Sequence, residues 1–177
     1  MIADAGGHAE FGLFAADDAP GTVGAESLQD GLERAYRYLT MRDRTVAEVR
    51  RHLTRQALAP ELVEACVAEL ERQRYLDDER FARRFAEDHR AFDGWGSERI
   101  RQRLLALGIE AEWAERAAGP GGGEEELNAA VAVLRRRLRV APSDERGRSR
   151  ALGLLVRRGY ELELAHDAIR RFEREPG

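Results

Sequence analysis

The chain contains no lysine, so each of its 29 basic side chains is an arginine. Without lysine, no phosphate-binding loop of the Gly-Lys-Ser or Gly-Lys-Thr type can form, and we expect no nucleotide hydrolysis. Cysteine is nearly absent: Cys66 stands alone, which excludes an internal disulfide and is typical of a reducing compartment. No apolar run approaches the length of a membrane span, and residues 1–10 have neither the basic start nor the apolar stretch of a signal peptide. We therefore expect a cytoplasmic protein that does not enter a membrane.

Catalytic and metal-binding patterns are missing too. The four histidines are scattered along the chain, and none stands beside Cys66 at a metal-ligand spacing. Asp77 and Asp78 directly precede a helical pattern, where carboxylates are more often helix caps than an acid–base pair. We predict no catalytic residue, no metal site and no cofactor, so the sequence points to binding rather than to chemistry.

What the chain does contain is a repeat of 51 residues, which relates Leu53, Leu104 and Leu155. The same offset relates three further sets of positions: Val49, Ile100 and Ala151; Ala57, Gly108 and Gly159; Cys66, Ala117 and Ala168. A period of this size is typical of a helical repeat array. We predict an all-α fold of three tandem three-helix repeats that form an elongated, curved array, with long surfaces for a partner.

Composition divides the chain into five segments. An acidic, Gly- and Ala-rich stretch without helical periodicity predicts a disordered tail over residues 1–27. Helical periodicity then predicts repeats over residues 28–74, 75–118 and 124–177, with Gly119–Gly123 as a linker that lets the third repeat swing. Within the repeats, Thr45 and Glu48 form a capping-box pattern, and Gly108 is placed as a helix stop. The second helix of the last repeat is predicted over residues 148–158.

Charge follows the repeat. The second helix of each unit is basic, with arginines against acids of five to two in residues 42–58, three to one in 96–109 and five to one in 145–159. The third helix of each unit is acidic instead, over residues 60–73, 110–117 and 161–175. These charges could simply pair and solvate the surface. Their threefold recurrence also fits a basic stripe of the kind that binds nucleic acid or an acidic protein.

The arginines of this stripe, together with those of the dense cluster at residues 135–139, are the candidate contacts with DNA or with a protein partner. We predict twelve: Arg50, Arg51, Arg55, Arg99, Arg103, Arg135, Arg136, Arg139, Arg148, Arg150, Arg157 and Arg158. Guanidinium groups bind phosphates and carboxylates through paired hydrogen bonds, which lysine cannot do. Since the chain as a whole has a net charge of −4, tight coating of DNA is not expected.

Two segments carry a family resemblance. The run Tyr75-Leu76-Asp77-Asp78-Glu79-Arg80-Phe81-Ala82 closely resembles the start of the second repeat of the RecX family, and Gly96-Ser97-Glu98-Arg99-Ile100 with Gly108-Ile109 matches its continuation. In the first repeat, the positions that resemble the family pattern are Leu39, Arg42, Thr45, Glu48, Val49 and Leu53. The resemblance covers about residues 30–175, and Arg74 stands where that family usually has glycine.

The resemblance implies a fold of three tandem three-helix repeats and a non-catalytic role. RecX-like proteins bind the filament of the RecA recombinase and inhibit its ATPase, strand-exchange and co-protease activities, which modulates DNA repair and the SOS response. The resemblance therefore implies a monomer that binds the RecA filament. It also implies weak binding to single-stranded DNA and to double-stranded DNA. Two other hypotheses stay open: a direct DNA-binding module or transcription regulator, and a helical scaffold for another protein.

Overall fold

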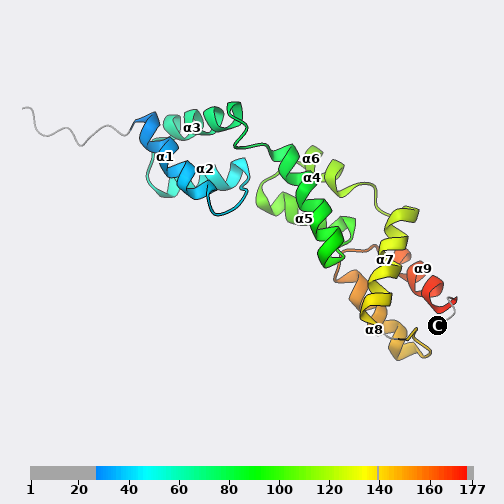
Figure 1. Cartoon of the computed structure of the whole chain (residues 1–177). Helices are drawn as coiled ribbons and strands as arrows, with labels where there is room; N and C mark the ends of the chain where they lie inside the picture. The colour runs from blue at the N-terminus through cyan, green and yellow to red at the C-terminus, as the bar shows by residue number, and fades with distance from the viewer. Residues whose placement is uncertain (1–26, 139, 175–177) are drawn as a thin grey trace, which may run out of the picture.

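The computed structural model describes residues 27–138 and 140–174, and its regular elements there are all helices (Figure 1). The predicted all-α fold is confirmed. Residues 1–26 of the predicted tail and the candidate Arg139 lie outside the described residues. The helices are α1 (Leu28–Leu39), α2 (Val46–Arg55), α3 (Pro60–Arg72), α4 (Asp78–Asp88) with a π-helical extension η1 (His89–Asp93), α5 (Ser97–Leu107), α6 (Ala111–Ala118), α7 (Glu124–Arg137), α8 (Glu145–Val156) and α9 (Leu162–Arg174).

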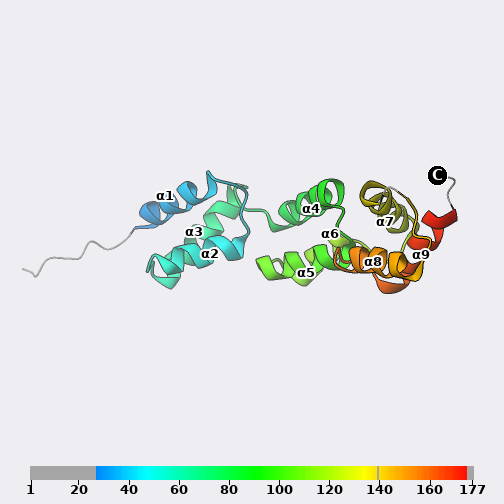
Figure 2. The same ribbon diagram turned by 90° about the horizontal axis from the view of Figure 1, so that it is seen from below.

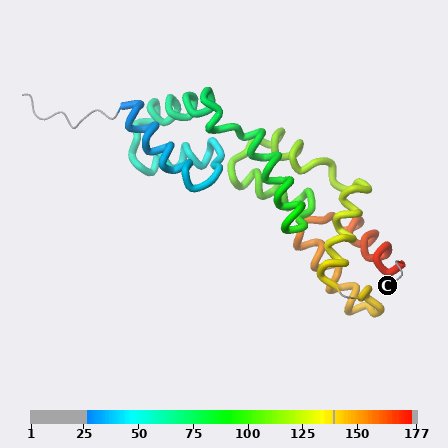
Figure 3. The backbone as a smooth tube through the Cα atoms, in the orientation of Figure 1, coloured from blue at the N-terminus to red at the C-terminus, as the bar shows by residue number. Residues whose placement is uncertain are grey.

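Buried hydrophobic side chains gather in three separate clusters, one for each successive group of three helices. The first unit, α1–α3, is centred on Leu53 and Leu70, the second, α4–α6, on Ile100 and Leu104, and the third, α7–α9, on Leu134 and Leu155. The three units follow one another as an elongated, curved chain (Figure 3). The residue bounds of the predicted repeats stay a prediction. Among the described residues, no helix is long and apolar enough to cross a bilayer.

Side-chain caps set where α1, α2 and α8 begin. Thr45 and Glu48 form the predicted capping box, in which the Thr45 hydroxyl accepts from the Glu48 N–H and the Glu48 carboxylate accepts from the Thr45 N–H. Ser27, placed in the tail by the sequence, caps α1 instead. The predicted start of α8 at Arg148 is wrong: α8 begins at Glu145, because Asp144 accepts from the Gly147 N–H at 2.7 Å.

A left-handed residue follows each of the three second helices. Ala57, Gly108 and Gly159 occupy equivalent positions of the repeat, with φ of 60°, 90° and 84°. This conformation ends the helix, as predicted for Gly108, and it also stops α8 at Val156 rather than at the predicted residue 158. Arg74 adopts φ of 63° as well, so the turn keeps the left-handed backbone that glycine would allow.

The first and second units meet end to end. The C-terminal end of α5 lies against the N-terminal end of α2, where the Thr45 hydroxyl donates to the Leu107 carbonyl at 2.9 Å. A carboxylate of the second unit completes the contact, since Asp78 accepts from the Val46 N–H at 3.0 Å. Opposite partial charges therefore face each other at this junction, the α5 carbonyls against the α2 amides.

The second and third units meet in the same way. The C-terminal end of α8 lies against the N-terminal end of α5, where the Gly96 N–H donates to the Arg158 carbonyl at 2.7 Å and the Glu98 N–H to the Gly159 carbonyl at 3.3 Å. Glu126 accepts from the Ser97 N–H at 2.7 Å. A Cβ atom on Gly159 would approach the Arg99 backbone nitrogen to 2.4 Å, so two backbones touch here without room for a side chain.

The two junctions are related by the 51-residue repeat. Leu107 and Arg158, which supply the carbonyls, are equivalent positions, and so are Thr45 and Gly96, which receive them. The three second helices are therefore joined head to tail, and Figure 2 shows α2, α5 and α8 as one row. A swing of the third unit about Gly119–Gly123 would break this junction, so these contacts argue against the predicted motion.

Candidate functional site

The second helices and the third helices lie on opposite edges of the molecule. In Figure 1, α2, α5 and α8 follow the lower left edge, whereas α3, α6 and α9 follow the upper right edge. The second helices are each basic. The third helices together hold more acids than arginines, because α3 and α6 are acidic while α9 has three of each, so each edge carries one sign of charge in excess. We call the outward side of α2, α5 and α8 the basic row.

Helical periodicity decides which arginines point outward from this row. In α8, Ala151 and Leu155 are buried, so with 3.6 residues per turn the opposite face carries Arg146, Arg150 and Arg157. All three are exposed, and among the described residues none of them is paired with a carboxylate. These three side chains are free to contact a partner.

The α8 face borders a shallow depression of about 580 Å³ between α7 and α8. Four arginines surround its apolar floor, and no acidic residue lines it. The lining residues are Arg137, Arg146, Arg150 and Arg157, together with Leu138, Leu154 and Ser149. Such a surface can take phosphate or carboxylate groups, each of which would relieve the repulsion between the guanidinium groups.

Repulsion between arginines is visible in the electrostatics of Arg158. Its pKa is lowered from the usual value by burial first and then by the positive charges of Arg137, Arg136 and Arg99. Arg158 donates to the Asp93 carbonyl at 3.3 Å, and Arg99 donates to the Arg157 carbonyl at 2.6 Å while its guanidinium lies over the Trp95 ring. Arg99 and Arg158 thus stabilise the junction of the second and third units through hydrogen bonds, and they also give it positive charge.

Two further predicted contacts are engaged within their own units. Arg50 forms a paired hydrogen bond with Glu64 of α3, at 2.6 and 2.8 Å, and Arg148 binds Glu173 of α9 at 2.7 Å. Each of these ion pairs joins a second helix to the third helix of the same unit, and they are less available than Arg150 and Arg157. Arg135 also has an interaction partner.

The rest of the predicted set is exposed. Arg51 donates to the Ala47 carbonyl of its own helix at 3.1 Å, and Arg55, Arg103 and Arg136 have no carboxylate partner among the described residues. The predicted set of contacts omits Arg137 and Arg146, although both line the α8 depression. The recurrence of arginine at positions 146, 150 and 157 was the signal for Arg146, since these positions share one helical face.

Exposed apolar side chains flank the basic row. Leu105 of α5 and Val156 of α8 are 38% and 46% exposed and occupy equivalent positions of the repeat. Phe92, in the π-helical turn, is 77% exposed, whereas Trp95 is half-buried and stacks on His89 at 4.0 Å. Apolar groups beside guanidinium groups suit a protein surface better than a bare phosphate backbone.

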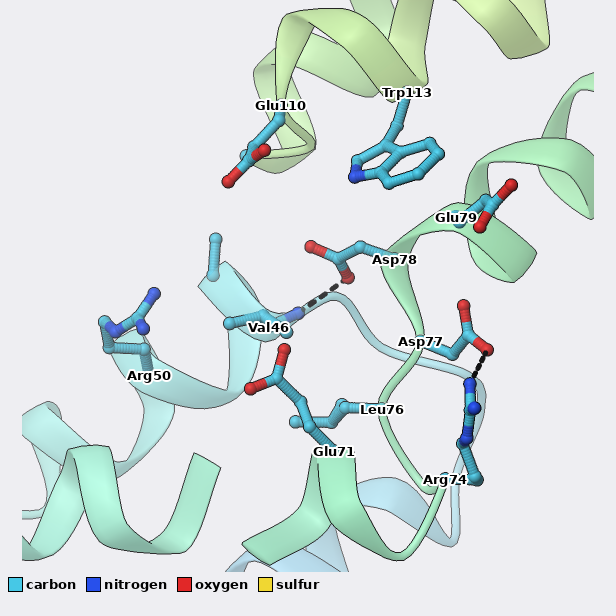
Figure 4. Close-up of a pocket in the computed structure, with 12 residues that line it drawn as sticks. Val46, Arg50, Glu71, Arg74, Leu76, Asp77, Asp78, Glu79, Glu110 and Trp113 are labelled. Atoms are coloured by element: carbon cyan, nitrogen blue, oxygen red, sulfur yellow. Dashed lines mark hydrogen bonds and ion pairs between the residues drawn. The ribbon is translucent and has the colours of Figure 1, made fainter. Parts of the chain in front are cut away.

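A cleft of about 430 Å³ lies between the first and second units, and its lining is mainly acidic where that of the α8 depression is basic (Figure 4). Five carboxylates line it, those of Glu71, Asp77, Asp78, Glu79 and Glu110, together with Arg50, Arg74 and Trp113. Burial raises the pKa of Asp78, and the neighbouring acids Glu71, Glu110 and Asp77 raise it further, against the hydrogen bond from Val46. Both aspartates are helix caps, Asp77 for α4 and Asp78 for α2 across the junction.

The described residues hold no group of three or more histidine, cysteine, aspartate or glutamate side chains that could bind a metal. The Cys66 thiol is buried in the first cluster and lies 3.8 Å from the Leu28 carbonyl, and burial raises its pKa. A raised pKa keeps the thiol protonated and unreactive at neutral pH. Cys66 is therefore part of the core, as its repeat position predicted.

Known proteins share both the sequence and the fold. Residues 32–70 match the domain described as RecX, first three-helix domain, and residues 77–117 the one described as RecX, second three-helix domain. The regulatory protein RecX of Trichlorobacter lovleyi is 34% identical over 146 residues, which cover 80% of this chain and 95% of that protein. The regulatory protein RecX of Herbaspirillum seropedicae is 34% identical over 138 residues, or 77% and 84% of the two chains.

Solved structures agree in fold. The crystal structure of RecX from Lactobacillus salivarius superposes with a TM-score of 0.71 at 17% identity, covering 82% of this chain and 96% of that one. The shared fold and the identity over most of both chains lead to one conclusion: this chain belongs to the RecX family of regulatory proteins.

Proposed function

We propose that this protein binds the filament of the RecA recombinase through the basic row and so inhibits the ATPase, strand-exchange and co-protease activities of that filament. In this role it modulates DNA repair and the SOS response as a non-catalytic, cytoplasmic monomer. The observation that carries the proposal is the repeated head-to-tail junction, which sets three basic helices in one line. A row of repeated surfaces suits a partner that is itself repetitive.

Exposed charge and exposed apolar groups together favour a protein partner. Arg150 and Arg157 offer guanidinium groups without carboxylate partners, and Leu105 and Val156 lie at the flank of the same row. The acidic partner surface and DNA phosphates inside the filament would both be attracted to the arginines. The apolar contacts would distinguish the protein from naked DNA.

The test is RecA ATPase on single-stranded DNA with increasing amounts of this protein. We expect inhibition at substoichiometric amounts. The double variant Arg150→Ala/Arg157→Ala should need about tenfold more protein for half inhibition, because two exposed charge contacts contribute roughly 0.5–1 kcal/mol each. The matched control is Arg148→Ala, because Arg148 is two residues from Arg150 in α8 but is bound to Glu173. This variant should inhibit like the wild type. Unchanged hydrolysis at excess wild-type protein would refute the proposal.

The α8 depression favours one second candidate, direct binding of DNA. Four guanidinium groups around it could neutralise phosphates, which would make the affinity fall steeply with salt. The same double variant separates the candidates. If DNA alone is the partner, the double variant should bind free DNA more weakly, and its affinity should depend less steeply on salt concentration. No effect of the variant should then require RecA.

A further inference from the structure

A pocket of about 530 Å³ lies between the second and third units, beside the Gly119–Gly123 linker. Its walls are the last turn of α6, the first turn of α7 and the two aromatic residues Trp95 and Tyr160. The volume falls in the range of small-molecule sites, roughly 300–1,000 Å³. Residues of both units line the pocket, so a molecule bound there would touch the second and the third unit at once.

The hydroxyl of Tyr160 is a buried polar group of this pocket that has no partner among the described residues. Tyr160 is 3% exposed, and its hydroxyl has no hydrogen-bond partner there. The charges that act on this hydroxyl include those of Glu126 and Arg90, and both residues line the same pocket. A buried hydroxyl without a partner costs free energy of folding, which a hydrogen bond to a ligand would recover.

The 51-residue repeat shows that packing does not require this hydroxyl. Leu58 and Ile109 occupy the positions equivalent to Tyr160 in the first two units, and both are buried in the cores of their units. An apolar side chain therefore fills this position twice in the same chain. The third unit differs by placing a polar atom at the end of the buried side chain.

The polar groups that the pocket offers to a ligand are hydrogen-bond donors. Burial first, and then the charge of Glu126, raise the pKa of Tyr160 to about 12, against the charges of three arginines. The hydroxyl therefore stays protonated at neutral pH and can donate. The first turn of α7 adds backbone amides, because Gly123 at its start provides no side-chain cap. Both groups favour a ligand with an oxygen acceptor.

The charged groups of the pocket favour an uncharged ligand, because most of them are already engaged. Arg90 donates to the Ala117 carbonyl at 3.1 Å and to the Ala118 carbonyl. Glu126 accepts from the Ser97 N–H at 2.7 Å. The other three charged lining residues are either paired or exposed: Glu124 pairs with Arg171, Arg116 pairs with Glu112, and Glu125 is exposed.

We propose that this pocket binds a small uncharged molecule with an apolar body and a carbonyl oxygen. The carbonyl accepts from the Tyr160 hydroxyl, and the body lies against Ala117 and Ala129. An ion would meet a charge of its own sign, in Arg90 or in Glu126. The bound molecule joins α6 to α7 and so stabilises the junction of the second and third units. This site is separate from the basic row and does not depend on the partner that the row binds.

The test uses benzamide, which has an aromatic body and one carbonyl group, in a titration of the full chain followed by backbone NMR signals. A fragment of this size binds a good site in the millimolar range. We expect saturable shifts at Ala118 and Ala129 and none at Val49 in the first unit. Benzoate and benzylammonium have the same ring with a negative and a positive charge, and each should bind at least about tenfold more weakly. Shifts that do not saturate, or equal binding of all three compounds, would overturn the proposal.

Tyr160→Phe removes the hydroxyl and keeps the ring. This variant should bind benzamide about tenfold more weakly, because one hydrogen bond is lost. It should not unfold at a lower urea concentration than the wild type, because the hydroxyl has no partner among the described residues. Tyr38→Phe in the first unit is the matched control and should bind benzamide like the wild type. Undiminished binding by Tyr160→Phe, or a lower urea midpoint, would show that the hydroxyl does not serve a ligand.

A second pair of variants fills the pocket instead. Ala129 is half-buried in its wall, whereas Ala132 of the same helix is exposed. Ala129→Leu should abolish benzamide binding, because the longer side chain takes the space of the ligand body. Ala132→Leu should leave the binding unchanged. Binding that survives Ala129→Leu would place benzamide elsewhere on the chain and refute the site.

Discussion

Gly159 lies where the backbones of the second and third units approach each other closely. Its backbone is left-handed, and an added Cβ would meet the backbone nitrogen of Arg99 at 2.4 Å. A side chain there costs about 1 kcal/mol for the left-handed conformation alone. The clash adds to this cost, because backbone atoms cannot move aside as a flexible side chain can.

Gly159→Ala should therefore lower the free energy of unfolding by clearly more than 1 kcal/mol, measured by urea denaturation. Gly122→Ala is the matched control, because Gly122 has the same φ of 84° but would meet no atom within 4 Å. It should cost about 1 kcal/mol and leave the junction intact. Equal losses in the two variants would mean that the close approach at Gly159 contributes nothing.

Local sequence predicted the features that depend on neighbours along the chain. The Thr45–Glu48 capping box and the left-handed stop at Gly108 follow from residue type and position, and both are confirmed. The sequence could not show that Asp78 caps α2 of the preceding unit, because that bond joins residues 32 apart. For the same reason it could not separate Arg148, bound to Glu173, from Arg150, since the difference depends on how α8 packs on α9.

At the scale of helices, the junction of the first and second units contains a carboxylate at a raised pKa. The protonated form of Asp78 is favoured in the folded state, by burial and by Glu71, Glu110 and Asp77 around it. Its contribution to stability is therefore fully present below the unfolded pKa of 3.8 and is lost as the pH rises through the folded pKa. Arg50 and Arg74 at the cleft do not reverse this direction.

Asp78→Asn should consequently unfold with a higher free energy than the wild type at pH 7, because asparagine still accepts from Val46 but carries no charge. The advantage should shrink as the pH falls and Asp78 becomes protonated. Asp30→Asn is the opposing control, since hydrogen bonds from Ser27 lower the pKa of Asp30, so its loss should be largest at neutral pH. A destabilised Asp78→Asn at pH 7 would show that the charge itself supports the junction.

At the scale of the molecule, the junction between units depends on a residue without a side chain after the second helix. Gly108 and Gly159 permit close approach of the next helix, whereas the equivalent position at the outer end of the first unit is Ala57, which carries a side chain. The Ala57 side chain therefore disfavours addition of a second copy at this end, which supports the proposed monomer.

The central claim is that the basic row, and not the acidic edge, faces the partner filament. Hydroxyl-radical footprinting of the protein with and without RecA bound to single-stranded DNA tests it directly. Leu105 and Val156 report on the basic row, and Leu162, which is 57% exposed at the start of α9, reports on the acidic edge. The account predicts that the filament protects Leu105 and Val156 and leaves Leu162 reactive; protection of Leu162 alone would contradict it.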